Sequence, residues 1–213
     1  MAHNETIEQS LLFGNSASIA SEVKDLLEKG VAAQSILDNS LLPGMAIVGE
    51  RFKRNEMFLP QVLMSAQAMQ TAIDILKPHL LDEAGKTVRQ KVIIGTVAGD
   101  MHDIGKNLVK IMLTGAGYEV IDLGVNVPAA RFLETAKKER ATFVCLSALL
   151  SSTMNNMRGV VELFRGEPEL QDTRILVGGA PVSQTFANEI GADGYAPTAP
   201  GTVELIQTIL SEK

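Results

Sequence analysis

The sequence is poor in the residues that build disulfides, cysteine-rich metal sites and nucleic-acid surfaces. It holds a single cysteine, Cys145, in 213 residues, which excludes an intrachain disulfide framework and a multi-cysteine metal or iron–sulfur site built by this chain. It has seven phenylalanines, two tyrosines and no tryptophan, and its 19 basic side chains are outnumbered by 25 acidic ones. Because phosphate binding needs clustered Lys and Arg, we expect no nucleic-acid partner.

Long apolar runs are absent as well. No stretch approaches the ~20 residues that span a bilayer, and residues 1–5 lack the basic region and apolar core of a secretion signal. We therefore expect a cytoplasmic protein that does not contact membranes. What remains is a globular composition, 46% hydrophobic and 21% charged, in a chain long enough for one or two modest domains with real cores.

The first part of the chain, residues 1–78, shows the three- and four-residue apolar spacing of amphipathic helices. Ser18 and Ser40 each precede such a stripe as expected N-caps, and a longer stripe begins near Pro60. With shorter helices between them, these stripes predict a small helical bundle. The segment 79–90 shows little periodicity and is the expected linker.

Residues 91–213 alternate between apolar strand-like runs and helical stretches, which predicts an α/β domain with a five-stranded, doubly wound parallel sheet of the Rossmann-like or flavodoxin-like kind. The continuous apolar run is typical of a strand that helices cover on both faces. The expected strands are 92–97, 118–123, 142–147, 174–177 and 194–196, and the expected helices are 104–116, 129–140, 154–164, 182–190 and 202–210. Ligands of such sheets bind outside the carboxyl ends of the strands, so the residues just after each strand are candidates for a site.

The loop after the first expected strand, residues 99–107, allows three interpretations. A phosphate-binding P-loop is disfavoured, because five residues rather than four separate its glycines and Asn107 replaces the Ser or Thr that would hold magnesium. In a structural interpretation Asp103 caps the following helix and His102 is an ordinary loop residue. In the third, His102 is a ligand through one ring nitrogen, and Asp100 accepts a hydrogen bond from the other and so sets the tautomer.

A site built only from protein ligands has too few parts for the third interpretation. His3 and His79 lie outside this unit, and Cys145 stands alone, so a zinc site with three or four ligands is not evident. A metal that brings its own equatorial ligands, as in a tetrapyrrole-like macrocycle, needs only one axial histidine.

Three spaced elements together resemble the cobalamin-binding signature of methyl-transferring corrinoid proteins. They are Asp100-x-His102-x-x-Gly105, Ser147-x-Leu149 and Gly178-Gly179. Upstream, residues 45–52 and 57–63 resemble the helical cap of cobalamin-dependent methionine synthase. The resemblance covers nearly the whole chain and is similar in extent to the stand-alone corrinoid proteins of methanogens and acetogens. It implies a cap domain at 1–78, a linker at 79–90 and a cobalamin-binding domain at 91–213.

The resemblance implies a role for each matching residue. His102 would bind cobalt from below in place of the cofactor's own base, with Asp100 and Thr153 forming a catalytic hydrogen-bond relay behind it. The displaced tail would run into the sheet domain past small residues. The implied cofactor contacts are Asp103, Ile104, Gly105, Ser147, Leu149, Ser151, Gly178 and Gly179 in the sheet domain, and Phe52, Leu59 and Val62 in the cap.

Plain structural roles remain open for several of these residues. Thr153 is equally suited to be the N-cap of a helix that starts at Met154. The glycine pair 178–179 is also what a tight strand-to-helix turn would use. The three apolar cap residues also fit the helical stripes of a bundle core, and periodicity alone cannot separate the two roles.

The function that the resemblance implies is methyl carriage in anaerobic one-carbon metabolism. A donor-specific methyltransferase would load a methyl group onto the corrinoid, and a second methyltransferase would pass it to tetrahydrofolate or coenzyme M. A reductive activation protein is a third implied partner. The chain lacks a substrate-binding barrel of about 250 residues, so we do not expect it to turn over substrate alone. The alternative is a cobalamin-dependent sensor, which needs an output domain, and an adenosylcobalamin mutase subunit is disfavoured by the cap.

Overall fold

The computed structural model describes residues 5–80 and 90–212, which form two compact units. The first holds the described residues up to Leu80, and the second holds nearly all of those from Gln90 onward. Residues 81–89, which make up most of the segment predicted as the linker, lie outside the described residues. No helix in the described ranges is long and apolar enough to cross a membrane.

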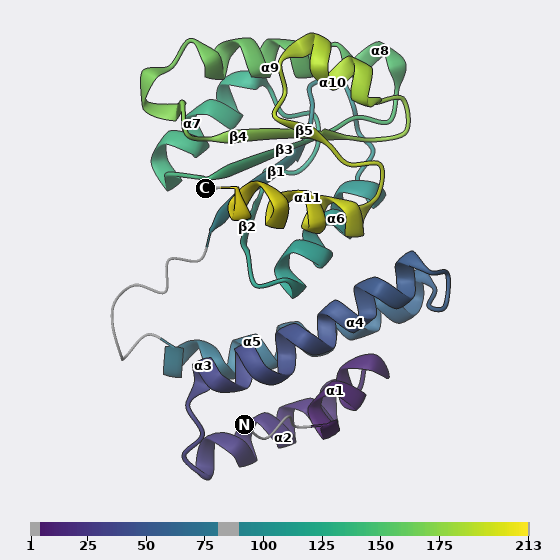
Figure 1. Ribbon diagram of the computed structural model, residues 1–213, viewed down its shortest axis with the longest axis vertical. Coiled ribbons are helices and arrows are strands. Elements are labelled where there is room, and N and C mark those ends of the chain that lie inside the picture. The colour runs from purple at the N-terminus through teal and green to yellow at the C-terminus, as the bar shows by residue number, and fades with distance from the viewer. Residues whose placement is uncertain (1–4, 81–89, 213) are drawn as a thin grey trace. The chain divides into compact units, whose positions relative to one another are not determined.

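The first unit is helical, as predicted, and its longest helices pack in pairs (Figure 1). Helix α2 packs on α5, and α1 packs on α4 and α2. Apolar side chains from each of these helices, among them Ile7, Ile19, Val48 and Met69, are fully or almost fully buried. The elements are α1 (Glu5–Leu12), α2 (Ser16–Glu28), α3 (Ala33–Ile36), the π-helical turn η1 (Leu37–Leu41), α4 (Leu42–Lys53) and α5 (Leu59–Leu80).

Both predicted N-caps of this unit are wrong. Helix α2 begins before Ser18, and its cap is Asn15, whose Oδ1 accepts a hydrogen bond from the backbone nitrogen of Ser18 at 3.1 Å. Ser40 is buried inside the π turn. It caps no helix, because the chain continues from α3 through η1 into α4 without a break. The extra residue of a π turn shifts the phase of the apolar stripe, which made one continuous helical run look like two helices.

The second unit is built on a five-stranded parallel sheet, which confirms the predicted fold class. The strand order is β2-β1-β3-β4-β5. The chain therefore moves outward from β1 to β2 and then returns to the other side of β1, so the strand order reverses between β1 and β3. The strands are β1 (Lys91–Thr96), β2 (Glu119–Asp122), β3 (Phe143–Ser147), β4 (Arg174–Gly178) and β5 (Gly194–Tyr195).

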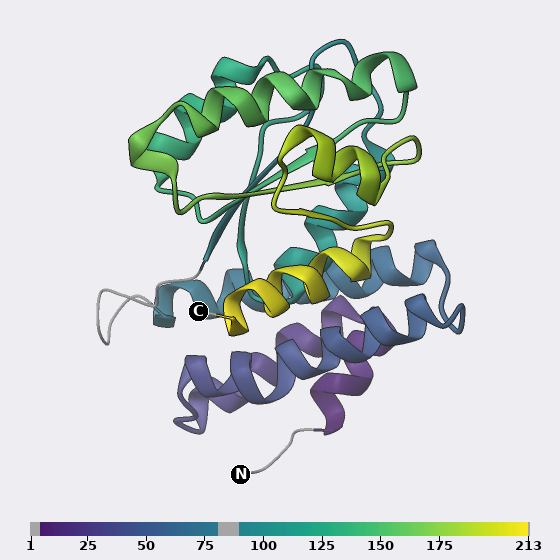
Figure 2. The ribbon, with the colours of Figure 1, turned by 45° about the horizontal axis from the view of Figure 1, so that its top comes forward.

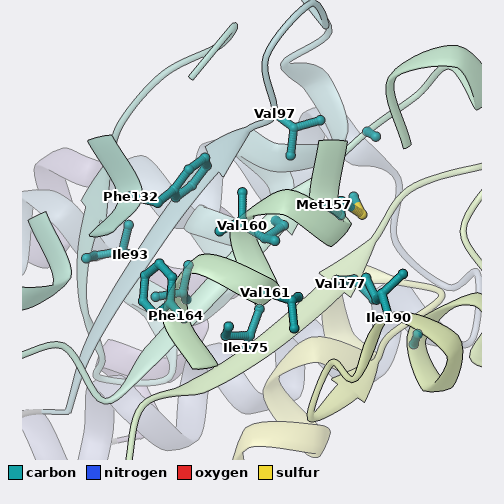
Figure 3. Close-up of a cluster of buried hydrophobic side chains, with 14 of the residues drawn as sticks. Ile93, Val97, Phe132, Met157, Val160, Val161, Phe164, Ile175, Val177 and Ile190 are labelled. Atoms are coloured by element: carbon teal, nitrogen blue, oxygen red, sulfur yellow. The ribbon is translucent and has the colours of Figure 1, made fainter. Parts of the chain in front are cut away.

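Helices cover both faces of this sheet, as Figures 1 and 2 show. Alternate residues of a strand point to opposite faces, so Ile93 joins the cluster under α7, α9 and α10, whereas Val92 and Ile94 join the cluster with α6 and α11. Figure 3 shows the first cluster, in which Phe132 and Phe164 pack beside Ile93. The helices are α6 (Ile104–Gly115), α7 (Ala129–Glu139), α8 (Ser151–Met154), α9 (Asn156–Arg165), η2 (Pro168–Leu170), α10 (Gln184–Ile190) and α11 (Ala199–Ser211).

Candidate functional site

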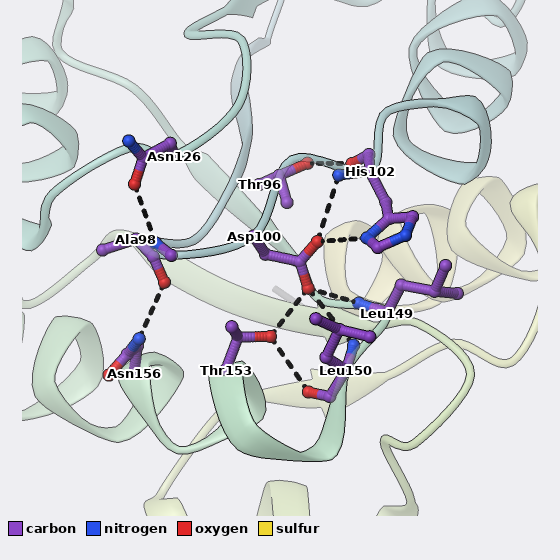
Figure 4. Close-up of polar contacts among 10 residues, drawn as sticks. Thr96, Ala98, Asp100, His102, Asn126, Leu149, Leu150, Thr153 and Asn156 are labelled. Atoms are coloured by element: carbon purple, nitrogen blue, oxygen red, sulfur yellow. Dashed lines mark hydrogen bonds and ion pairs between the residues drawn. The ribbon is translucent and has the colours of Figure 1, made fainter.

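The loop between β1 and α6 presents one imidazole backed by one buried carboxylate (Figure 4). His102 Nδ1 lies 2.7 Å from Asp100 Oδ1, and the same oxygen accepts a hydrogen bond from the backbone nitrogen of His102 at 3.1 Å. The His102 side chain is 49% exposed, whereas the Asp100 side chain is fully buried. An ionised carboxylate can only accept, so Nδ1 carries the proton and Nε2 of the neutral ring keeps a lone pair that can bind a metal.

Asp100 joins the loop after β1 to the loop after β3. Its Oδ2 accepts hydrogen bonds from the backbone nitrogens of Leu149 at 2.8 Å and Leu150 at 3.2 Å, and from Thr153 Oγ1 at 2.7 Å. Burial by itself raises the pKa of Asp100, but the hydrogen bonds from Thr153, Leu149 and His102 outweigh it and hold that pKa well below its usual value. The carboxylate behind the imidazole is therefore ionised at neutral pH.

Thr153 contacts this carboxylate and does not cap a helix at Met154. It lies inside the short helix α8, and the next helix, α9, begins at Asn156. Its hydroxyl is 2.7 Å from Asp100 Oδ2 and 2.9 Å from the Leu150 carbonyl oxygen, so its single proton is shared between these two acceptors. Of the two roles left open for Thr153, the capping role is therefore wrong, and the hydroxyl contacts the Asp100 carboxylate, as the resemblance implies.

Three polar residues that the sequence analysis did not assign also hold this loop. Thr96 Oγ1 donates to the carbonyl oxygen of His102 at 2.8 Å. Asn126 Oδ1 accepts from the backbone nitrogen of Gly99 at 2.7 Å, and Asn156 Nδ2 donates to the carbonyl oxygen of Ala98 at 2.7 Å. Each stands at the end of a strand, in the loop after one or at the start of a helix. That position in a doubly wound sheet is the signal that could have identified them.

The three glycines of the resembling signature meet different surroundings. A Cβ at Gly179 would lie 1.8 Å from the carbonyl oxygen of Ala148, and Gly179 has a φ of +127°, so the chain itself requires glycine there. A Cβ at Gly178 would lie 3.1 Å from the carbonyl oxygen of Ala196. A Cβ at Gly105, in the first turn of α6, would meet no protein atom within 4 Å. The space at Gly105 therefore fits a group that lies against the backbone.

Apolar side chains are exposed in the same two loops. Met101 lies beside His102 in the first loop, Ile104 is the first residue of α6, and Leu149 and Leu150 lie in the second loop. Isolated exposed apolar residues are common, but four in or next to the two loops joined by Asp100 fit a large ligand with an apolar face. Of the other predicted contacts, Ser147 and Gly178 end neighbouring paired strands, whereas Asp103 and Ser151 are exposed at the starts of α6 and α8.

The three predicted cap residues differ in burial. Val62 is fully buried in the helical unit. It therefore takes the bundle-core role, one of the two roles that its apolar periodicity allowed. Phe52 and Leu59 are partly exposed. Leu59 begins α5 and Phe52 lies in the last turn of α4, so both side chains stand next to the connection between these helices.

Within the described residues no three His, Cys, Asp or Glu side chains gather as a metal site. Cys145 is buried, and burial raises the pKa of its thiol to about 12, so it is an inert core residue. A metal held by His102 would therefore bring most of its ligands with it. This donor set fits a corrinoid, whose ring supplies the equatorial nitrogens.

A cavity of about 550 Å³ lies in the sheet unit but away from these residues. It is lined by Lys137, Arg140, Thr142, Glu169 and Thr173, among others, near the amino ends of β3 and β4. None of the residues assigned to the cofactor lines it. The candidate site is thus an open edge of the sheet, where ligands of doubly wound folds bind, and not this cavity.

Comparison with known proteins gives matches in both units. A family model described as a B12 binding domain matches residues 90–204, and a second model with the same description matches residues 4–77. A corrinoid protein of Desulfitobacterium hafniense is 38% identical over 212 residues, which are 98% of this chain and 97% of that protein. Dimethylamine corrinoid protein 1 of Methanosarcina acetivorans is 40% identical over 188 residues, 88% of this chain and 83% of that protein.

A solved structure agrees with these sequence matches. A chain in the crystal structure of the methanol:cobalamin methyltransferase complex from Methanosarcina barkeri has a TM-score of 0.89 and 28% identity, and the match covers 100% of this chain and 82% of that one. One family model covers more than half of the chain, and the corrinoid relatives match most of it. The chain therefore belongs to the family of B12-binding corrinoid proteins.

Proposed function

We propose that this protein is a methyl carrier that binds a corrinoid base-off, with His102 Nε2 as the lower axial ligand. The observation that carries the proposal is the half-exposed imidazole whose other nitrogen is held 2.7 Å from a buried carboxylate. When bound, the corrinoid supplies the cobalt centre that receives and releases the methyl group. The residues that would hold it are His102, Ile104, Gly105, Ser147, Leu149, Gly178 and Gly179, with Asp103 and Ser151 at the rim.

The chain's own residues orient and tune the imidazole. Asp100 keeps the proton on Nδ1 and so keeps Nε2 available as a ligand. The buried, ionised Asp100 carboxylate also lies where it would stabilise positive charge on the imidazole. Thr153 donates to that carboxylate and completes the relay, which makes Asp100 and Thr153 the partners of His102 in the reaction cycle.

We further propose that two separate enzymes and a reductive activation protein complete the system. The names of the relatives support a donor such as dimethylamine or methanol, bound by its own methyltransferase. The acceptor enzyme would transfer the methyl group to tetrahydrofolate or coenzyme M. Because α5 ends at Leu80, we extend the proposed cap to residue 80, and a linker at residues 81–90, before the cobalamin-binding domain at 91–213, would let the cap move aside for each partner.

The test of axial ligation is the visible spectrum of the recombinant chain loaded with cobalamin. We expect the spectrum of a base-off, histidine-ligated corrinoid, and His102→Gly should replace it with that of a corrinoid without an imidazole ligand. His79→Gln is the matched control, because His79 lies in the last turn of α5, outside the sheet unit, and should leave the spectrum unchanged. An unchanged spectrum in His102→Gly would remove His102 from the proposed role.

A second experiment separates the carrier from the sensor. Methylation of the reduced, corrinoid-loaded protein is followed spectroscopically with a methylamine or methanol donor, in the presence and absence of a donor methyltransferase. The carrier proposal expects methylation with the enzyme and none without it. DNA binding that depends on cobalamin or light would favour the sensor instead.

A further inference from the structure

The backbone just before His102 is held from two sides by asparagine side chains, as Figure 4 shows. Asn126 lies in the loop after β2, and Asn156 is the first residue of α9. Asn126 Oδ1 accepts from the Gly99 backbone nitrogen, and Asn156 Nδ2 donates to the Ala98 carbonyl oxygen, both at 2.7 Å. The two side chains therefore belong to different elements and form hydrogen bonds to neighbouring residues of the same loop.

Asn126 makes a second contact with the same loop through its own backbone. Its backbone nitrogen donates to the carbonyl oxygen of Asp100 at 2.9 Å, and the next residue, Val127, forms a parallel bridge with Val97. Asn126 has a φ of +53°, in the left-handed region that asparagine tolerates better than most residues. A residue held in that region where it makes two such contacts is a candidate for a role at a site.

Asn156 reinforces the contact that the α8–α9 segment already makes with Asp100. Thr153, three residues earlier, donates to the Asp100 carboxylate, so this segment holds both the side chain of Asp100 and the backbone of Ala98. Between these two points lies Gly99, whose φ of +78° marks a residue with wide backbone freedom. The turn is closed by one hydrogen bond of its own, from the Asp100 backbone nitrogen to the Val97 carbonyl oxygen at 3.1 Å, and the contacts from Asn126 and Asn156 add to it from outside.

We propose that Asn126 and Asn156 are positioning residues, which hold the backbone of 98–100 so that the Asp100 carboxylate meets His102 Nδ1. Neither touches the imidazole, and both act through Asp100. The proposal deepens the proposed function, on which it rests only for the identity of what His102 binds. Because both side chains are largely exposed, each hydrogen bond should shift the balance between the positioned and unpositioned imidazole by about 2- to 10-fold.

Matched variants isolate each hydrogen bond. Asn126→Gly keeps a residue that adopts positive φ but removes the acceptor, whereas Asn126→Asp restores an acceptor of the same shape. Asn156→Asp keeps the shape and replaces the donor with an acceptor facing the Ala98 carbonyl oxygen. We expect Asn126→Gly and Asn156→Asp to loosen the imidazole and Asn126→Asp to behave like the unmodified protein.

The first readout needs no cofactor. Nitrogen-15 NMR of the histidine rings in the full cofactor-free chain reports the tautomer of His102, with His79 as an internal reference. We expect the share of His102 with the proton on Nδ1 to fall in Asn126→Gly and Asn156→Asp, while the melting temperature shows that each variant is folded. The second readout is the histidine-ligated fraction of the cobalamin-loaded chain as a function of pH, which should shift in the same two variants.

The outcomes separate this proposal from the function it rests on. If both loosening variants keep the His102 tautomer and the ligated fraction of the unmodified protein, the proposal is overturned, and it is equally overturned if Asn126→Asp fails to rescue. If the tautomer shifts as expected but His102→Gly leaves the cobalamin spectrum unchanged, the positioning role stands and the proposed axial ligation fails.

Discussion

Gly105 and Gly179 show that one residue type can serve two purposes in the same site. At Gly179 the close approach of the Ala148 carbonyl oxygen and the positive φ exclude a side chain whether or not a ligand is bound. At Gly105 no protein atom excludes one. The two glycines therefore allow the demands of the fold to be separated from the demands of the cofactor.

Alanine at Gly179 should reduce stability, whereas alanine at Gly105 should reduce the affinity for cobalamin. We expect Gly179→Ala to lower the free energy of unfolding by about 3 kcal/mol or more, because overpacking and backbone strain add. Gly105→Ala should change it by less than about 1 kcal/mol, since a helical alanine is favourable, yet weaken cobalamin binding by about tenfold or more. Urea unfolding and equilibrium titration with cobalamin measure the two quantities. Unchanged cobalamin affinity in Gly105→Ala would place the cofactor elsewhere.

The hydroxyl of Thr153 can be tested with two near-isosteric replacements. Thr153→Val removes a hydrogen bond to a buried, ionised carboxylate and should lower the free energy of unfolding by about 1.5–3 kcal/mol. Thr153→Ser keeps the hydroxyl and should lose clearly less. If the relay role is correct, Thr153→Val also changes the pH dependence of the histidine-ligated spectrum and Thr153→Ser does not. A loss in Thr153→Val that is no larger than the loss in Thr153→Ser would show that the hydroxyl is not the main contribution of Thr153.

At the scale of elements, a buried ion pair fastens α6 to the end of β2. The Lys106 side chain is 2% exposed, and its Nζ lies 2.7 and 2.8 Å from the two Asp122 oxygens. Asp122 Oδ1 also accepts from the Gly124 backbone nitrogen at 2.9 Å. Burial alone would raise the pKa of Asp122, but these hydrogen bonds and the Lys106 charge lower it. The pair thus fixes the start of the helix that follows the His102 loop.

Asp122→Asn should destabilise the protein by about 3 kcal/mol at pH 7, because it leaves the Lys106 charge buried without a counterion. The unfolded carboxyl has a pKa of about 3.9 and the folded one a lower value, so the unfolded state binds more protons as the pH falls through this range. The advantage of Asp122 is complete above about pH 5 and should shrink as the pH falls below about 4. Urea unfolding at pH 7, 5 and 3 measures it.

The control for this ion pair is Asp25→Asn. Asp25 pairs with Lys29 on an exposed face of α2, where an ion pair contributes little. We expect a change of less than about 0.5 kcal/mol at neutral pH. A loss in Asp122→Asn that is no larger than this would show that the buried pair does not fasten the helix.

At the scale of the whole molecule, the helical unit and the sheet unit carry different parts of the proposed chemistry. The sheet unit holds the residues that we propose as ligands, and the helical unit holds the apolar residues that the resemblance implies as cofactor contacts. Because Val62 is buried in its own unit and Leu59 is partly exposed, their contributions to the fold and to the cofactor can be told apart.

Leu59→Ala and Val62→Ala should divide these contributions. Val62→Ala should lower the free energy of unfolding by about 1–3 kcal/mol through lost burial in the bundle. Leu59→Ala should cost less but speed the oxidation of the reduced, cobalamin-loaded protein by oxygen, because a smaller apolar lid admits water and oxidant. Anaerobic stopped-flow mixing with oxygenated buffer measures that rate. An unchanged rate in Leu59→Ala would remove this residue from the lid.

The pattern of residues was sufficient for the fold class but not for the details of helix starts. The apolar runs of β1, β3 and β4 identify strands because helices bury both faces of the sheet there. The edge strands β2 and β5 are less buried or shorter, and their alternation with helical stretches indicates them. Ser18 and Ser40 were misassigned because many residues near a helix start can cap it, and a π turn hides a continuous helix. A single polar residue therefore indicates a helix start less reliably than apolar periodicity indicates a helix or a strand.

In the candidate site, too, some contacts could be predicted from the sequence and others could not. Asp100 and His102 are two residues apart and follow a strand directly, so their pairing could be predicted from the sequence. The hydrogen bonds of Asn126 to Gly99 and of Asn156 to Ala98 span 27 and 58 residues, and the partner of Lys106 is 16 residues away. No local pattern records such contacts.

The sequence by itself determined that helices are followed by five β–α units and that polar residues stand at the ends of the strands, because apolar periodicity is written locally along the chain. The tertiary structure decided the contacts among these residues that are distant in the chain, such as those of Asn126 and Asn156. The reversal of strand order between β1 and β3 brings the ends of two strands together, and only there can the buried Asp100 accept from His102 and Thr153 at once.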